Sequence, residues 1–450
     1  MRSSTDETSS SPISSPWSTD VQAHLQAAED MRKSGDEFAA LAHMIAAQSL
    51  AAWHGKDPDY SALPVCNVAT GYFMLNQHAL AQRWYDLVLS MEPAPDIAAI
   101  AYLNLAAIHA QADRPDQARH CKHQAYRIQR IFIEQPERPL RRLLLLCEGA
   151  GSGNVPLDTL LATGTNTRIK YVLDFADERE DQGLPEFDLV FNVIGEPDIS
   201  PALQQRLLRF EAACAKPLLN RPASVAHTQR QQMPQRLNQV PDVVMPPCIR
   251  LNTPPGSIEA LQDQLTQAGI VFPVLLRPWA THGGKDMLRC EDLASLWTEV
   301  RGLSGSYITA FHEFRSPDGY YRKYRMIFID GEPYPYHLAI SSHWMVHYFS
   351  ADMLGHPWKI AEESRFLQHP RASLGERAMA AVSAIGRQLA LDYAGIDFTV
   401  LEDGRVLVFE ANATMLIHLE RQDGPLQHKN PYVKNIVSAF ERALQRHSPA

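Results

Sequence analysis

Two carboxylates and an amide near the C-terminal end of the chain are spaced so that one β-hairpin would bring them together. Asp397 and Glu410 stand on either side of Asp403-Gly404, a dipeptide typical of two-residue type I′ turns. Counting back from such a turn along both strands places Asp397 directly opposite Glu410. Asn412 projects to the same face, because side chains alternate along a strand. The spacing therefore predicts a cluster of oxygen ligands.

Such a cluster favours a metal site. Directly opposed carboxylates on one sheet face repel each other, and Arg405, the basic residue of the hairpin, lies at its turn end. Carboxylate and amide oxygens suit a hard cation such as Mg²⁺. A solvated polar face is the alternative interpretation. The residues between the ligands are expected to point into the core: Leu407, Phe409 and Ala411.

Basic residues upstream are placed to meet a polyanion. Lys323 and Arg325 lie two apart, so both side chains project from one face of a strand. Arg277 ends an apolar strand, where an arginine without an anionic partner is costly to bury; a structural ion pair is the competing explanation. Gly283 and Gly284 precede Lys285, and glycine backbones can approach phosphate closely because no Cβ intervenes. Loop solubility is the alternative for Lys285.

The elements that position these residues form the last part of a chain with several domains. Residues 222–448 carry two hairpin signals, Asp330-Gly331 and Asp403-Gly404, and two helical segments at about 373–392 and 431–446, which predicts an α+β domain. His343 and His347 have helical spacing but lack the glutamate of a zinc motif. Their segment is expected either to line the acceptor pocket or to pack in the core.

Residues 140–221 predict a parallel α/β subdomain, because short apolar strands alternate with helices. Gly149, Gly151 and Gly153 follow the first strand, which invites a dinucleotide-binding interpretation. Asn154 stands where the third glycine of that motif belongs, so a plain strand-to-helix turn is favoured. The expected strands are Leu143–Cys147, Ile169–Phe175, Phe187–Val193 and Pro217–Leu219.

Residues 19–135 predict an all-α domain, with a helical pattern from Val21 to Glu134. Ala81 and Ala118 each begin the second helix of a helix pair, at a spacing close to the tetratricopeptide period of ~34 residues. Residues 21–52 supply a further pair. The domain could form a groove for a protein or peptide partner, or a bundle that dimerises or covers the enzyme. The Ser-rich residues 1–18 are expected to be disordered.

Composition excludes several function classes. The chain of 450 residues is 45% hydrophobic and 21% charged, and its net charge of −9 is spread, with no basic track for nucleic acid. Its six cysteines show no metal-binding spacing, and no apolar run reaches the ~20 residues of a membrane span. We therefore expect a soluble, cytoplasmic protein that contacts neither nucleic acid nor membrane.

Residues 140–445 resemble ATP-grasp carboxylate–amine ligases, such as glutathione synthetase, D-alanine–D-alanine ligase and the ribosomal-protein glutamate ligases. The segment from Tyr393 to Asn412 is similar to their metal-binding hairpin, with an aspartate on one strand and Glu-x-Asn on the next. The resemblance implies a pre-ATP-grasp α/β subdomain followed by an ATP-grasp domain. One departure is that Arg277 stands where the family has a phosphate-binding lysine; Arg230 is matched to an earlier lysine position.

The resemblance also implies ligands and chemistry. ATP with Mg²⁺, or Mn²⁺ as an alternative ion, would phosphorylate a carboxylate, and an amine would displace phosphate to form an amide. The implied metal ligands are Asp397, Glu410 and Asn412, and the implied catalytic residues are Arg325 and Lys285. The implied ATP-binding residues are Arg230, Arg277, His282, Gly283, Gly284, Lys285, Thr309, Ala310, Phe311, His312 and Lys323.

Three functions stay open at this point. The first is a ligase that joins a small-molecule acid to an amine. The second is an ATP-grasp enzyme that modifies a protein or peptide docked on the helical domain. The third is a non-catalytic nucleotide-binding scaffold. A homodimer is compatible with each of them.

Overall fold

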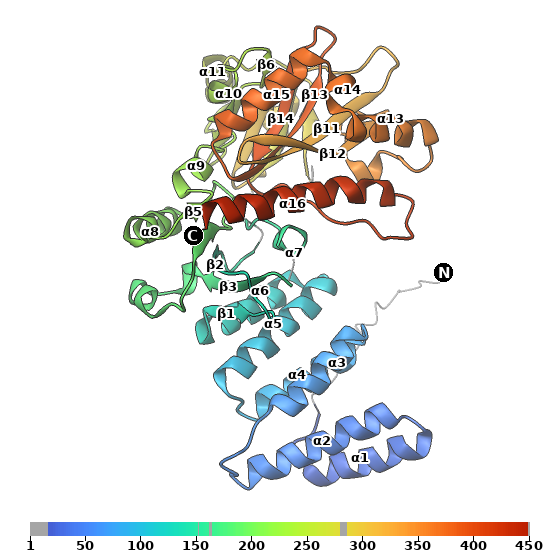
Figure 1. Ribbon diagram of the computed structural model, residues 1–450. Helices are drawn as coiled ribbons and strands as arrows, with labels where there is room; N and C mark the ends of the chain where they lie inside the picture. The colour runs from blue at the N-terminus through green and yellow to red at the C-terminus, as the bar shows by residue number, and fades with distance from the viewer. Residues whose placement is uncertain (1–16, 152, 162–163, 280–285, 449–450) are drawn as a thin grey trace, which may run out of the picture. The chain divides into compact units, whose positions relative to one another are not determined.

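The computed structural model describes residues 17–151, 153–161, 164–279 and 286–448. The chain divides into two compact units, one ending at Ile131 and the other beginning at Phe132. The first unit is helical, and the second contains all the sheets (Figure 1).

The helical unit consists of three consecutive helix pairs. Local sequence sets their starts: Asp20 and Asp36 cap the first two helices with their side chains, and proline occupies the first turn of α5 and α6. Ala81 and Ala118 both lie in the first turn of the second helix of a pair, as predicted. The helices are α1 (Val21–Ser34), α2 (Glu37–His54), α3 (Leu63–Met74), α4 (His78–Ser90), α5 (Pro95–Gln111) and α6 (Pro115–Ile128).

The helical pattern predicts helix as far as Glu134, and this prediction is wrong for the last four residues, 131–134. Ile131–Glu134 forms strand β1 at the edge of the first sheet, beside β3 (Asn166–Val172). Two isoleucines and a phenylalanine favour an extended chain. Glu134 then accepts hydrogen bonds from Lys170 (2.6 Å) and Arg168.

The first sheet has the order β1-β3-β2-β4-β5, and its strands β2 to β5 run parallel. All four strands predicted in 140–221 are present, although Leu173–Phe175 is a 3-10 turn rather than the end of β3. Asn154 ties the glycine-rich turn back to Glu148 by two hydrogen bonds of 2.9 Å, so this turn is closed on itself. The elements are β2 (Arg141–Cys147), α7 (Leu157–Leu160), β4 (Leu189–Asn192), α8 (Pro201–Ala213) and β5 (Leu218–Leu219).

A second, antiparallel sheet has the order β7-β10-β8-β9 and is covered by two helices. Asp292 and Ser257 cap those helices with their side chains. The elements are α9 (Pro222–Ala226), α10 (Met233–Leu237), β7 (Cys248–Leu251), α11 (Ile258–Gln267), β8 (Val274–Pro278), β9 (Leu288–Cys290), α12 (Leu293–Val300) and β10 (Ser306–Ala310).

The third sheet, in the order β12-β11-β13-β14-β6, carries the hairpins. Asp330 and Gly331 both have positive φ and join β11 directly to β12, which confirms the first predicted type I′ turn. Its elements are β6 (Val243–Val244), β11 (Tyr321–Ile329), β12 (Glu332–Ser341), β13 (Tyr393–Val400) and β14 (Val406–Asn412).

Helices cover both faces of this sheet (Figure 1). One face packs against α13 (Pro357–Gln368), α14 (Pro370–Leu374) and α15 (Glu376–Leu389). The other packs against α16 (Asn430–His447), whose apolar side also meets β2 and β4 of the parallel sheet. Within the described residues, no helix is long and apolar enough to cross a bilayer.

Candidate active site

Strands β13 and β14 place Asp397 directly opposite Glu410, as predicted, although the hairpin closes by a different turn. Leu401 N–H donates to the Arg405 carbonyl (2.8 Å), and Gly404 has φ 82°, so the loop is Glu402–Gly404, one residue longer than predicted. A bulge at Phe409 adds one residue to β14. The two departures cancel, and the predicted opposition of the carboxylates is restored.

The bulge corrects the prediction for the core face of β14. Because it reverses the alternation of side chains, Val408 rather than Leu407 joins the core beneath α15. Leu407 lies instead on the side of the carboxylates, and Phe409 is half-buried against Phe314, with ring centroids 4.7 Å apart. Ala411 is in the core as predicted.

The carboxylates open onto a cavity of about 630 Å³ between the second and third sheets. Five lysine or arginine side chains and two carboxylates line it within the described residues. The excess of positive charge suits a polyanionic ligand. These ionisable groups are Arg230, Arg277, Lys323, Arg325, Lys429, Asp397 and Glu410.

Asp397 is buried and bound by two cations of the neighbouring strand β11. Arg325 donates to both carboxylate oxygens of Asp397, from Nε to Oδ1 (2.6 Å) and from Nη2 to Oδ2 (2.9 Å). Lys323 Nζ lies 3.2 Å from Oδ2. Burial opposes ionisation, but Arg325 and Lys323 outweigh it and hold the pKa of Asp397 well below its usual range. Asp397 is therefore a permanent carboxylate.

Glu410 is bound in the same way from another part of the chain. Arg230 donates to Oε1, and so does the Asn412 side-chain amide (2.9 Å). Burial alone would raise the pKa of Glu410, but Arg230 and Arg277 hold it at about 2. As expected from its place at the turn, Arg405 does not reach the carboxylates and pairs with Asp403 instead. The cations that neutralise Asp397 and Glu410 come from outside the hairpin.

The donor set fits a hard divalent cation. Asp397 and Glu410 supply ionised oxygens, and the Asn412 Oδ1 atom, which accepts from Thr414 N–H (3.0 Å), supplies an amide oxygen on the same side. Arginines hold both carboxylates in this arrangement. A phosphate chain offers those arginines an alternative anionic partner and would leave carboxylate oxygens for the ion.

The second sheet supplies the opposite wall. Arg277 on β8 pairs with Tyr307 on β10 and is almost fully buried in the cavity lining. Burial, together with Arg230, lowers the pKa of Arg277. Four of the residues that the resemblance implies for ATP binding also line the cavity, at and just after the end of β10: Thr309, Ala310, Phe311 and His312. His282, Gly283, Gly284 and Lys285 lie outside the described residues.

The segment 344–349 lines the cavity beside β12. His347 and His343 are not on a helix, so their spacing does not form a zinc pair. Among the wall residues that the sequence did not reveal are His337 and Lys429. No sequence motif marks Lys429. Its side chain is buried and donates to Glu420 (2.8 Å), and its Nζ atom lies 4.3 Å from the Tyr348 ring centroid.

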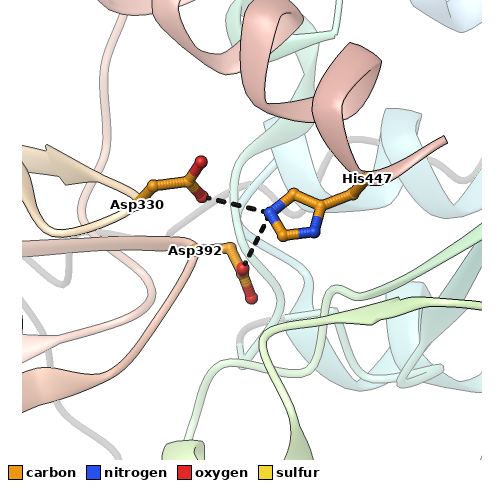
Figure 2. Close-up of side chains that lie close together, drawn as sticks. All are labelled: Asp330, Asp392 and His447. Atoms are coloured by element: carbon orange, nitrogen blue, oxygen red, sulfur yellow. Dashed lines mark ion pairs between the residues drawn. The ribbon is translucent and has the colours of Figure 1, made fainter.

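A separate cluster gathers at the far end of the third sheet. Figure 2 shows His447 of α16 between Asp330 and Asp392, with Nε2 3.5 Å and 3.6 Å from their Oδ1 atoms. Among the described residues, this is the one group of three His, Cys, Asp or Glu side chains whose possible ligand atoms all lie within 4.8 Å of one another. Arg446 also pairs with Asp330, and Asp392 accepts from Asn220 N–H (2.6 Å). The cluster is therefore a set of ion pairs at the C-terminal end of α16.

Comparison with known proteins gave matches of structure only. No protein-family model and no curated protein sequence matches the chain. D-alanine–D-alanine ligase from Bacillus anthracis matches at 15% identity and a TM-score of 0.40, covering 68% of this chain and 98% of that one. The RimK-domain ATP-grasp protein from Sphaerobacter thermophilus matches at 12% identity and 0.38, covering 67% and 98%. The D-cycloserine synthetase DcsG matches at 16% and 0.39, covering 68% and 100%.

Proposed function

We propose that this protein is an ATP- and Mg²⁺-dependent ligase that activates a carboxylate as an acyl phosphate and joins it to an amine. One observation carries the proposal. Four cations from three separate segments, Arg230, Arg277, Lys323 and Arg325, line one cavity with two carboxylates that are ionised at neutral pH. Triphosphate binding with a hard cation uses this combination.

The chemistry needs positioning and charge neutralisation. A carboxylate oxygen of the acid attacks the γ-phosphorus of ATP, and ADP leaves. The amine nitrogen then attacks the acyl carbon, the bond to phosphate breaks, and the amide and phosphate are released. Preorganised cations stabilise the charge that develops on phosphate oxygens.

Residue roles follow from the cavity walls. Arg325 and Arg277 would neutralise the transferred phosphate, and Lys285 would join them from the glycine loop. Thr309 to His312 would meet the adenine through their backbone. Asp397, Glu410 and Asn412 would hold Mg²⁺, which would supply positive charge to stabilise the phosphate groups during transfer. Arg in place of lysine keeps the charge and adds a bidentate fork.

The helical unit favours a second candidate, in which the substrate is a protein or peptide. Three successive helix pairs form a unit apart from the sheets, and several of their large apolar side chains are exposed. Met74 is 73% exposed and Leu41 58%. Stacked helix pairs present extended surfaces for partners. The cavity chemistry is the same for both candidates.

The proposal is tested by product analysis. Purified protein is incubated with Mg²⁺, ATP and a pooled library of amino acids and short peptides, and the mixture is compared by mass spectrometry with an E410Q reaction. We expect ADP and a condensed product from the wild type only. ADP formation with no new product, or product in equal amount from E410Q, would contradict the ligase.

A further inference from the structure

His337 on β12 is a buried cavity residue with an unused ring nitrogen. Its side chain lines the cavity and is only 7% exposed. Its Nε2 atom has no hydrogen-bond partner in the described part of the chain. Buried polar atoms are rarely left unpartnered, and each exception calls for an explanation. A bound ligand is one such explanation.

The surroundings hold the imidazole in place. The ring stacks on Tyr348, with centroids 5.0 Å apart and planes 30° apart. Tyr348 donates to Glu363 (2.9 Å), and the same carboxylate accepts from Leu338 N–H (3.2 Å), next to His337 in the strand. One buried carboxylate thus anchors both the strand and the stacking ring. The imidazole is therefore held in place at the cavity wall.

The charged groups facing His337 favour an anionic ligand. Arg325 on β11 lies directly opposite His337 in the strand pairing, and Lys323 is also on β11. Lys429 approaches from the start of α16. The one acid in this set is Asp397 on β13. Burial, followed by Arg325, holds the pKa of His337 well below its usual value, so the ring is neutral. A neutral imidazole has one N–H to donate to an anion.

We propose that the imidazole of His337 donates a hydrogen bond to the carboxylate of the acid substrate and so fixes where the acid lies. This inference rests on the proposed ligase function. The attacking oxygen must lie beside the γ-phosphate, and Arg325 is the cation assigned to that phosphate. In the strand order β12-β11-β13, His337 lies on the side of Arg325 away from Asp397. The acid therefore lies between Arg325 and the aromatic segment 344–349.

The test uses the full-length protein with each of the twenty standard amino acids as the acid, Mg²⁺, ATP, and hydroxylamine as the amine. Hydroxylamine attacks the acyl phosphate, phosphate leaves, and the resulting hydroxamate is measured. Four variants are compared with the wild type. H337L removes both ring nitrogens. In H337Q, the side-chain amide N–H lies as many bonds from Cβ as Nε2 does in histidine. In H337N, the amide N–H takes the position of Nδ1. H369L replaces an exposed histidine outside the cavity lining and is the control.

We expect H337L to raise the KM for the acid about tenfold or more, the usual effect of losing a hydrogen bond to a charged group. The KM for ATP should stay within about twofold, and either H337Q or H337N should restore most of the acid KM. An unchanged acid KM in H337L, or equal loss in all three His337 variants, would overturn the inference and leave the ligase intact. No hydroxamate from the wild type with any acid would overturn both.

Discussion

At the scale of single residues, the site is a set of charges held ready by one another. Asp397 is ionised because Arg325 and Lys323 surround it, and Glu410 because Arg230 and Arg277 do. Each pair is buried, where removing one partner leaves the other uncompensated. Without a ligand these charges stabilise the fold, and with a phosphate chain the same arginines have a second partner.

The pKa of Glu410 gives a prediction for stability against pH. Its folded-state value of about 2 lies below the ordinary 4.5, so its ionisation contributes stability above pH 4.5 that is lost as pH falls towards 2. The contribution is about 3 kcal/mol. We expect E410Q to unfold more easily than the wild type at pH 7, and the difference to shrink between pH 5 and pH 3.

Thermal unfolding at each pH measures this difference. E402Q, which removes an exposed acid of the same hairpin, is the matched control and should show no such trend. A gap between wild type and E410Q that stays constant down to pH 3 would show that Arg230 does not hold the carboxylate ionised.

Individual residues also mark how far the sequence can predict the site. Hairpin spacing opposed Asp397 and Glu410 correctly only because the longer loop and the bulge shift the register by one residue in opposite senses. It could not find the partner of Glu410, since Arg230 lies 180 residues earlier in the chain. Arg325, 72 residues from Asp397, was predicted as a phosphate ligand but not as a fork on that aspartate. Such pairings depend on strand order, which no local pattern encodes.

Among the elements, the third sheet has one face that is packed core along part of its length and lines the cavity further along. Ile327 and Ile329 pack against α16, while Arg325 and Lys323 on the same face of β11 line the cavity. The two hairpins of this sheet were both marked by Asp-Gly, yet only Asp330-Gly331 forms the type I′ turn. The second uses a longer loop and a bulge, a combination that the dipeptide alone does not distinguish.

The second loop gives a prediction about the hairpin. Gly404 has φ 82°, a backbone region in which alanine costs about 1–2 kcal/mol and asparagine less. We expect G404A to lower the unfolding free energy by that amount and G404N to lower it less. Denaturant unfolding measures both variants. G256A is the control, at a glycine without positive φ and with open space where the added Cβ would lie, and it should be close to neutral. Equal loss in G404A and G404N would indicate a clash rather than backbone strain.

At the scale of the whole molecule, the cavity belongs to one unit. Every described residue that lines it comes from 154–429, inside the unit that begins at Phe132. The helical unit has its own core, built around Trp84, Tyr85 and the alanine-rich faces of its helices. Its sequence pattern predicted the three helix pairs but overran into β1, because helical periodicity does not register the β-branched residues that begin the first sheet.

This division predicts that nucleotide binding survives removal of the helical unit. A chain of residues 132–450 should bind Mg²⁺–ATP within about threefold of the full-length affinity in calorimetry, since no cavity residue is lost. If the target is a docked peptide, activity on peptides should fall while activity on single amino acids remains. A truncated chain that is folded by circular dichroism yet does not bind ATP would contradict the assignment of the site to the second unit.

In the proposed reaction, a carboxylate is activated as an acyl phosphate in the cavity that Arg325 and Asp397 line. The most direct test follows ¹⁸O from the carboxylate of the acid that gives product. An acyl phosphate leaves one carboxylate oxygen on the phosphate, so we expect one ¹⁸O in the inorganic phosphate for each amide formed. Phosphate without label, or label found in AMP, would contradict it.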